Sequence, residues 1–133
     1  MKVPSRRVLV IEDEADIRER IVKGLGFAGY EVSAANDGAE GIASLQEQRS
    51  DVIICDMMMP SLNGFGTLTV LKDHAELSDI PVIVLTALGE KTTRDFAFGK
   101  GARGYLTKPF QLGELVEMIE GLFDPAQPDG ETA

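Results

Sequence analysis

Polar side chains follow several short apolar runs of this sequence. Glu12 and Asp13 follow the first run, Asp56 follows the second, Thr86 follows the third, and Lys108 lies near the end of a later, shorter one. If these runs are strands of one parallel sheet, their carboxyl ends meet at one edge. Three carboxylates gathered there repel one another, and Mg²⁺ is a suitable counter-ion because it prefers oxygen ligands and often joins carboxylates to a phosphate. The pattern predicts a magnesium site at Glu12, Asp13 and Asp56.

The same residues can carry out phosphoryl chemistry. A carboxylate can attack phosphorus and become an aspartyl phosphate, and the protein then mainly positions groups and neutralises charge. Asp56 is the candidate nucleophile, because Glu12 and Asp13 lie side by side and are better placed for the metal. Lys108 and the Thr86 hydroxyl are then candidates to contact the remaining phosphoryl oxygens.

Each of these residues also has a plain structural explanation when it is taken singly. Asp13 could cap a helix, Glu12 could be a solvated strand end, and Asp56 could belong to a turn before a proline. Lys108 could be a surface charge, and Thr86 could simply end a strand. Their joint order favours a functional site, because the structural explanation must account for each strand end independently.

The elements that position these residues follow from the hydrophobic pattern. Three runs rich in β-branched residues, Val8–Ile11, Val52–Cys55 and Val82–Leu85, are typical of parallel strands buried on both faces. Tyr30–Ala34 is more polar and Gly104–Thr107 is shorter, so these two are predicted as the edge strands.

Segments with helical spacing alternate with the strands. They are Asp16 to Leu25, a segment that opens at Asp37, Phe65 to Asp73, Glu90 to Phe98, and a last segment with the stripe Leu112, Leu115, Ile119 and Leu122. In the second segment, Ala39, Ile42, Ala43 and Leu45 are expected to face inward. Glu14 and Arg18 are expected to form an i,i+4 pair on the outside of the first. Five strand–helix alternations predict an α/β fold with a doubly wound parallel sheet.

Composition limits the classes of protein to consider. The 133 residues suit one domain, and the net charge of −9 disfavours binding to nucleic acid or anionic membranes. The lone cysteine, Cys55, excludes an internal disulfide and leaves no basis for a zinc site. No stretch approaches the length of a signal peptide or a membrane span, so a cytoplasmic location is expected. The last residues, 124–133, are expected to be a disordered tail or the start of a linker.

Four ordered signals together resemble the CheY-like receiver domains of two-component response regulators. They are the pair Glu12-Asp13, the segment Asp56 to Pro60 followed by Gly64, the pair Thr86-Ala87, and the segment Gly101 to Phe110. The resemblance spans about residues 6 to 123 and gives a domain boundary of 1–123. It implies a flavodoxin-like fold with strand order 2-1-3-4-5.

The resemblance also implies a role for each site residue. A sensor histidine kinase or a histidine phosphotransfer protein would donate a phosphoryl group to Asp56. Asp13, Asp56 and the backbone carbonyl of Met58 would bind Mg²⁺ with help from Glu12, and Lys108 would pair with the phosphate.

For the output, the resemblance implies that Thr86 moves toward the phosphoryl group and that Tyr105 rotates inward. These changes would remodel the face of the fourth helix, fifth strand and fifth helix, where a downstream protein binds. The bond between Lys108 and Pro109 would be cis. The chain would be a signalling switch that assists its own phosphorylation and dephosphorylation, and not an enzyme with a separate substrate.

Two other readings keep the same fold. The chain could be an interaction module that is never phosphorylated, or the N-terminal part of a larger regulator with an output domain. A mononucleotide binder is disfavoured because Glu12, Asp13 and Glu14 have the wrong charge for a phosphate cradle. A haloacid-dehalogenase-like phosphatase is disfavoured because Met58 stands where its pattern requires a second aspartate.

Overall fold

The structure is a computed structural model that describes residues 6–57, 64–87 and 91–123. Its centre is a five-stranded parallel sheet. The strands are β1 (Arg7–Ile11), β2 (Glu31–Ala35), β3 (Val52–Asp56), β4 (Val82–Thr86) and β5 (Gly104–Thr107). The helices are α1 (Ala15–Phe27), α2 (Gly38–Glu47), α3 (Gly64–Asp73), α4 (Lys91–Gly99) and α5 (Leu112–Phe123). The strand order is β2-β1-β3-β4-β5, which confirms the predicted fold class and both edge strands.

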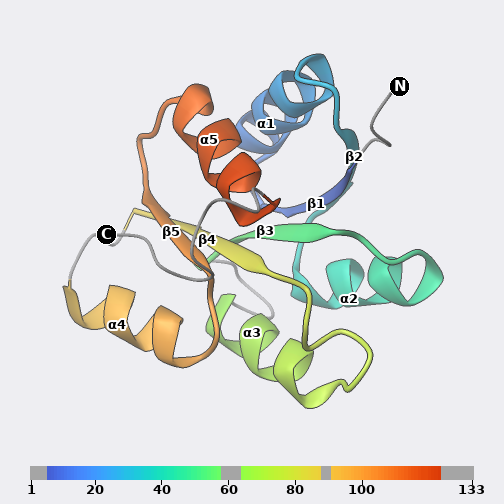
Figure 1. Cartoon of the computed structure of the whole chain (residues 1–133), viewed down its shortest axis with the longest axis vertical. Coiled ribbons are helices and arrows are strands. Elements are labelled where there is room, and N and C mark those ends of the chain that lie inside the picture. Colours follow the sequence, from blue (N-terminus) through green and yellow to red (C-terminus); the bar gives the residue numbers. More distant parts are fainter. Residues whose placement is uncertain (1–5, 58–63, 88–90, 124–133) are drawn as a thin grey trace.

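The sheet is covered on both faces. Helices α1 and α5 lie on one face, and α2, α3 and α4 lie on the other (Figure 1). The five residues of β3 and the five of β4 are all buried, whereas most of β2 is not. This difference explains why the central strands are continuous apolar runs and the edge strand is more polar.

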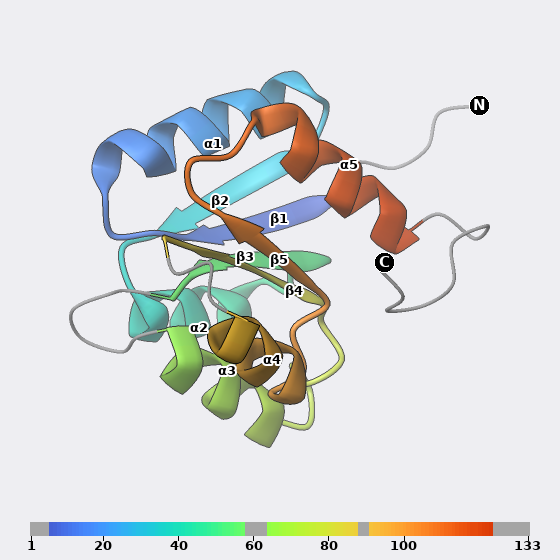
Figure 2. The same cartoon turned by 90° about the vertical axis from the view of Figure 1, so that its left-hand side faces the viewer.

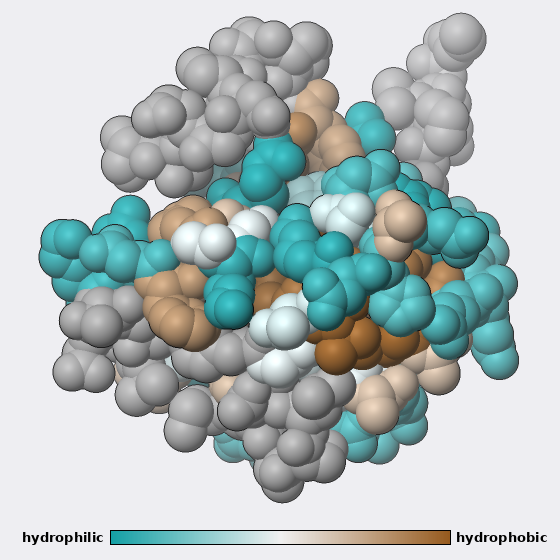
Figure 3. All heavy atoms as spheres, turned by 90° about the horizontal axis from the view of Figure 1, so that it is seen from below, coloured by the Kyte–Doolittle hydropathy of each residue, from teal (hydrophilic) through white to brown (hydrophobic). Residues whose placement is uncertain are grey.

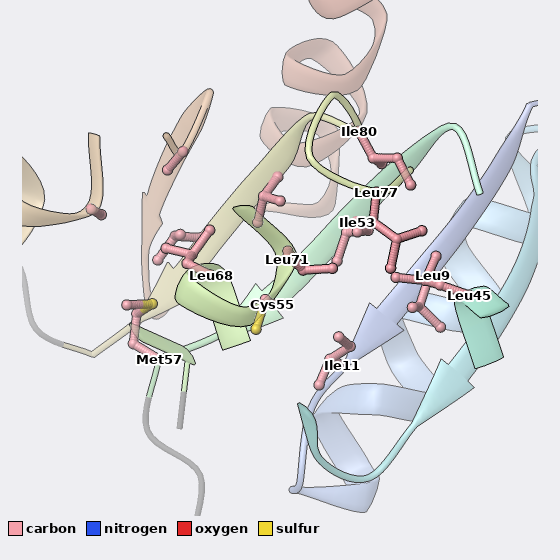
Figure 4. Packing of buried hydrophobic residues seen from close by; sticks show 14 of the residues in the cluster. Leu9, Ile11, Leu45, Ile53, Cys55, Met57, Leu68, Leu71, Leu77 and Ile80 are labelled. Atoms are coloured by element: carbon pink, nitrogen blue, oxygen red, sulfur yellow. The ribbon is translucent and has the colours of Figure 1, made fainter. Parts of the chain in front are cut away.

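Alternate residues of each central strand enter different cores. On one face, Leu9 of β1 and Ile53 of β3 belong to the same cluster as Leu68 of α3, and Figure 4 shows Leu9 beside Leu45 of α2. Val10 packs with Ile21 of α1 and with the buried residues of α5 on the other face. The two-residue period of a strand therefore divides the apolar side chains between two separate cores.

Helix α2 differs from its predicted packing. Ala39 and Ala43, which were expected to face inward, are exposed, whereas Gly38 and Gly41 are buried together with Leu45. A Cβ atom on Gly41 would lie 2.5 Å from Cδ1 of Ile11, so the helix approaches the sheet where it has no side chain. The expectation for the two alanines was wrong because the closest approach is made by glycines.

The start of α2 is fixed by a capping box at Asp37, where the second helical segment was predicted to open. The backbone N–H of Glu40 donates to Asp37 Oδ1 at 2.8 Å, and the backbone N–H of Asn36 donates to Glu40 Oε1 at 2.6 Å. These bonds satisfy backbone donors that have no partner within the helix.

The carboxyl ends of the strands lie at one edge of the sheet. Figure 2 shows β1 and β2 running side by side toward the edge where α1 begins. The underside of the molecule, where α2, α3 and α4 lie in Figure 1, is largely hydrophilic with smaller hydrophobic areas between (Figure 3). Asp56 and Thr86 are the last residues of β3 and β4, so the edge at the carboxyl ends holds polar residues singled out in the sequence.

Candidate functional site

Three carboxylates meet at the carboxyl ends of β1 and β3. Ile11, the last residue of β1, pairs in register with Cys55, so Glu12 after β1 lies beside Asp56, the last residue of β3. One carboxylate oxygen from each of Glu12, Asp13 and Asp56 lies within 4.8 Å of the others. Glu12 is 0% exposed and Asp56 is 2% exposed, whereas Asp13 is accessible to solvent. The structure thus brings together the three acidic residues that the sequence pattern selected.

Lys108 faces this cluster from the loop after β5. Its Nζ lies 3.0 Å from Glu12 Oε1 and 3.4 Å from Asp56 Oδ2, and its side chain is 15% exposed. The backbone N–H of Lys108 donates to the carbonyl oxygen of Thr86 at 2.7 Å, which ties the loop to the end of β4. The Lys108–Pro109 peptide bond is cis. One ammonium group therefore lies against two buried carboxylates.

The charges of the cluster alter one another. Burial and the neighbouring Asp56 carboxylate raise the pKa of Glu12 from 4.5 to about 7, although Lys108 acts in the opposite direction. Burial alone would lower the pKa of Lys108, but Glu12 and Asp56 outweigh it, so the pKa of Lys108 is raised above its ordinary value. The ammonium is held charged, and the negative charge around it is in excess.

The cluster has the properties of a binding site for a hard cation. Among the described residues, Glu12 Oε1 is a buried oxygen that accepts no well-directed hydrogen bond, although Lys108 forms an ion pair with it. Carboxylate oxygens in this number are the ligands that Mg²⁺ prefers, and a divalent cation would offset their repulsion. Glu12, Asp13 and Asp56 therefore fit the ion. Met58, the fourth expected ligand, lies outside the described residues.

The structural explanation for Asp13 does not hold, because another residue occupies the helix cap. The N-cap of α1 is Glu14, and its side chain forms no capping hydrogen bond. The expected Glu14–Arg18 pair was also wrong: Arg18 Nη1 donates to the backbone carbonyl of Glu12 at 2.8 Å, and Glu14 Oε1 lies 3.8 Å from Lys108 Nζ. Arg18 and Glu14 thus belong to the surroundings of the site, which their sequence spacing did not reveal.

The two predicted switch residues lie on neighbouring strands. Thr86 ends β4 and is fully buried, and Tyr105 of β5 is partly buried against the core beneath α4. The rings of Tyr105 and Phe98 of α4 are 6.4 Å apart. Tyr105 pairs in register with Val84, two residues before Thr86, and therefore links the middle of the sheet with helix α4.

Comparison with known proteins places this fold and site in a family. The model of the response regulator receiver domain matches residues 8–120. This chain belongs to the family of receiver domains of two-component response regulators, which are signalling switches.

Its relatives include longer proteins. The transcriptional regulatory protein PrrA of Mycobacterium tuberculosis is 42% identical over 120 residues, which are 90% of this chain and 51% of PrrA. The response regulator MprA of Mycobacterium leprae is 37% identical over 123 residues, covering 92% of this chain and 53% of MprA. The chain therefore spans about half the length of the curated relatives it matches.

Solved structures of similar domains agree in fold. The chemotaxis response regulator CheY4 of Vibrio cholerae superposes with a TM-score of 0.83 at 32% identity, covering 88% of this chain and 98% of that one. The signal receiver domain of a histidine kinase from Syntrophus aciditrophicus gives a TM-score of 0.81 at 28% identity, covering 97% and 98%. Among the described residues, no helix is both long and apolar enough to span a membrane.

Proposed function

We propose that the Asp56 carboxylate accepts a phosphoryl group from a phosphohistidine on a sensor histidine kinase or a histidine phosphotransfer protein. The observation that carries this proposal is the position of Asp56: it is 2% exposed, it ends a central strand, and the Lys108 ammonium lies 3.4 Å from it. A buried carboxylate beside one fixed cation is placed to act as a nucleophile whose product gains negative charge.

The transfer exchanges one bond for another. An oxygen of Asp56 attacks phosphorus, a P–O bond forms, and the P–N bond to the donor imidazole breaks. The electron pair of that bond stays on the ring nitrogen, and the imidazole becomes neutral on taking up one proton. Lys108 then exchanges its contacts with Glu12 and Asp56 for a phosphoryl oxygen. Its ammonium group thereby neutralises negative charge on the transferred phosphoryl group.

Asp13, Asp56, the Met58 carbonyl and Glu12 would hold Mg²⁺, which supplies neutralisation of the phosphoryl oxygens when it is bound. Asp13 is open to solvent and would contribute a ligand beside the buried Asp56. Glu12 is buried on the side of Lys108 and would complete the charge balance.

The signal would pass from the site to a binding face. In this proposal Thr86 turns its hydroxyl toward the phosphoryl group, and Tyr105 moves further into the space next to it. The contact of Tyr105 with Phe98 then changes, and the face of α4, β5 and α5 is presented differently to a downstream protein. The phosphoryl group acts by fitting one packing of the domain better than the other.

The output depends on what lies beyond this domain. Since the transcriptional regulatory protein PrrA and the response regulator MprA are about twice as long as their matched part, an output domain after residues 1–123 is one way to use the signal, with residues 124–133 as linker. The net charge of −9 supports the further proposal that the receiver itself does not contact nucleic acid. We also propose that it works in the cytoplasm, where sensor kinases present their phosphohistidine.

Labelling with a small phosphodonor tests the acceptor. Acetyl phosphate with Mg²⁺ should add one phosphoryl group to the intact chain, seen by mass spectrometry as an acid-stable and base-labile adduct. Asp56→Asn should abolish the adduct, since it removes the nucleophilic oxygen and leaves the size of the side chain unchanged. An adduct of equal yield in this variant would refute the role of Asp56.

The same measurement after chelation of divalent ions tests the metal. Labelling should fall strongly with EDTA and return when Mg²⁺ is added in excess. Unchanged labelling would remove the role proposed for Glu12 and Asp13 as metal ligands, and would support an acceptor that works with Lys108 alone.

A further inference from the structure

A further carboxylate lies on the solvent side of the Lys108 ammonium. Glu14 Oε1 is 3.8 Å from Lys108 Nζ, and the Glu14 side chain is 63% exposed, whereas the side chains of Glu12 and Asp56 are 0% and 3% exposed. A small anion that binds at the ammonium therefore lies close to the Glu14 charge. This residue lies outside the set of three oxygens that fit a metal ion.

The side chain of Glu14 has no role in starting helix α1, although the Glu14 carbonyl accepts from the backbone N–H of Arg18 at 2.9 Å. It occupies the N-cap position, yet its side chain forms no capping hydrogen bond, and glutamate is not among the preferred capping residues. Asp16 already provides an acidic group in the first turn. The backbone of Glu14 is anchored separately, because its N–H donates to Glu12 Oε2 at 3.3 Å. The side-chain charge can thus be removed without loss of a contact that holds the fold.

The electrostatic balance of the site makes this charge consequential. Lys108 Nζ lies within 4 Å of carboxylate oxygens from Glu12, Glu14 and Asp56, and Asp13 adds another carboxylate to the cluster. The excess negative charge attracts cations and repels anions, and small phosphodonors are anions. The repulsion grows in proportion to the charge of the donor.

We propose that Glu14 is a specificity-determining residue that disfavours small phosphodonors according to their negative charge. This inference rests on the proposed role of Asp56 as acceptor. At a separation of about 6 Å in water, one unit charge on Glu14 changes the local concentration of an anion roughly threefold for each negative charge that it carries, when salt is low. Glu14 thereby limits phosphorylation of the domain by acyl phosphates that arrive without a kinase.

The test compares two donors whose charges differ. Acetyl phosphate is a dianion near neutral pH, and phosphoramidate carries one negative charge less. Initial rates of Asp56 labelling would be measured for the wild type and Glu14→Gln at low salt, with Mg²⁺ titrated to saturation for each protein. We expect Glu14→Gln to accelerate acetyl phosphate roughly tenfold and phosphoramidate roughly threefold. In Glu14→Gln, the ratio of the acetyl phosphate rate to the phosphoramidate rate should return toward the wild-type ratio at about 1 M salt.

Controls separate the possible failures. Glu47→Gln removes an equal charge at the carboxyl end of α2, away from the site edge, and should leave the ratio unchanged. A ratio that is the same in Glu14→Gln and the wild type at low salt would overturn the inference, as would equal changes for both donors, which a purely structural role would produce. Absence of labelling of the wild type by either donor would instead count against Asp56 as acceptor.

Discussion

The Glu12 carboxyl group is completely buried, and its pKa of about 7 lies above the ordinary value of 4.5 because of burial and the nearby Asp56. A raised carboxyl pKa means that the folded protein binds a proton that the unfolded chain has already released. The stabilisation by protonated Glu12 is therefore fully present below about pH 4.5 and is lost as the pH rises through about 7.

Glu12→Gln should remove this pH dependence, because glutamine is neutral at every pH. With EDTA present, the variant should have a higher free energy of unfolding than the wild type at about pH 8, and the difference should disappear near pH 4.5. Urea denaturation at several pH values measures it. A difference that stays constant with pH would show that the Glu12 carboxyl is not held in its protonated form by folding.

The acidic part of the site could be predicted because parallel strands place their carboxyl ends together. Lys108 was predicted at the same edge, but its direct contacts with Glu12 and Glu14 were not, because strand order does not show which carboxylates a long side chain in the following loop reaches. The spacing rule also misplaced Glu14: i,i+4 pairing assumes two helical residues, and Glu14 is an extended N-cap residue with φ of −83° and ψ of 114°.

At the scale of elements, strands were predicted more closely than helix faces. The run Val82–Leu85 differs from β4 by one residue, because a strand buried on both faces needs an unbroken apolar sequence. In α2 the buried Gly41 lies against Ile11 of the sheet, and hydrophobicity alone favours the alanines beside it. Gly41 can approach Ile11 because it has no side chain, and a hydrophobic pattern does not identify such a residue.

Gly41→Ala tests that contact directly. The new Cβ would lie 2.5 Å from Cδ1 and 2.8 Å from Cγ1 of the buried Ile11, so we expect a loss of about 1–3 kcal/mol of stability. Gly26→Ala in α1 is the matched control, because its Cβ would meet nothing within 4 Å, and the change should stabilise by roughly 0.5–1 kcal/mol. Chemical denaturation of both variants decides the matter, and equal effects would contradict the packing described for α2.

Across the whole molecule, the proposed signal travels from Thr86 to the neighbouring strand and then to α4. The chain contains no tryptophan and two tyrosines, so the variant Tyr30→Phe leaves Tyr105 as the single source of tyrosine emission. In that background, phosphorylation should change the tyrosine emission as Tyr105 moves. Adding Thr86→Val should leave labelling of Asp56 in place but abolish the change in emission, because valine keeps the shape of threonine without its hydroxyl.

An emission change that persists with Thr86→Val would show that Tyr105 responds to the phosphoryl group by another route. Thr86→Ser is the matched control for this pair, since it restores a hydroxyl at the same position. It should recover most of the response if the hydroxyl carries the signal.

The single thiol of the chain is fully buried directly before the acceptor residue, and burial raises the pKa of Cys55 above its ordinary value. An alkylating reagent can reach it only when β3 separates from its neighbours. With no second cysteine to give a background signal, the rate of alkylation serves as a chemical clock for opening of the central sheet. The alkylation rate of Cys55 thus measures how much a bound cation or a phosphoryl group suppresses local opening around β3.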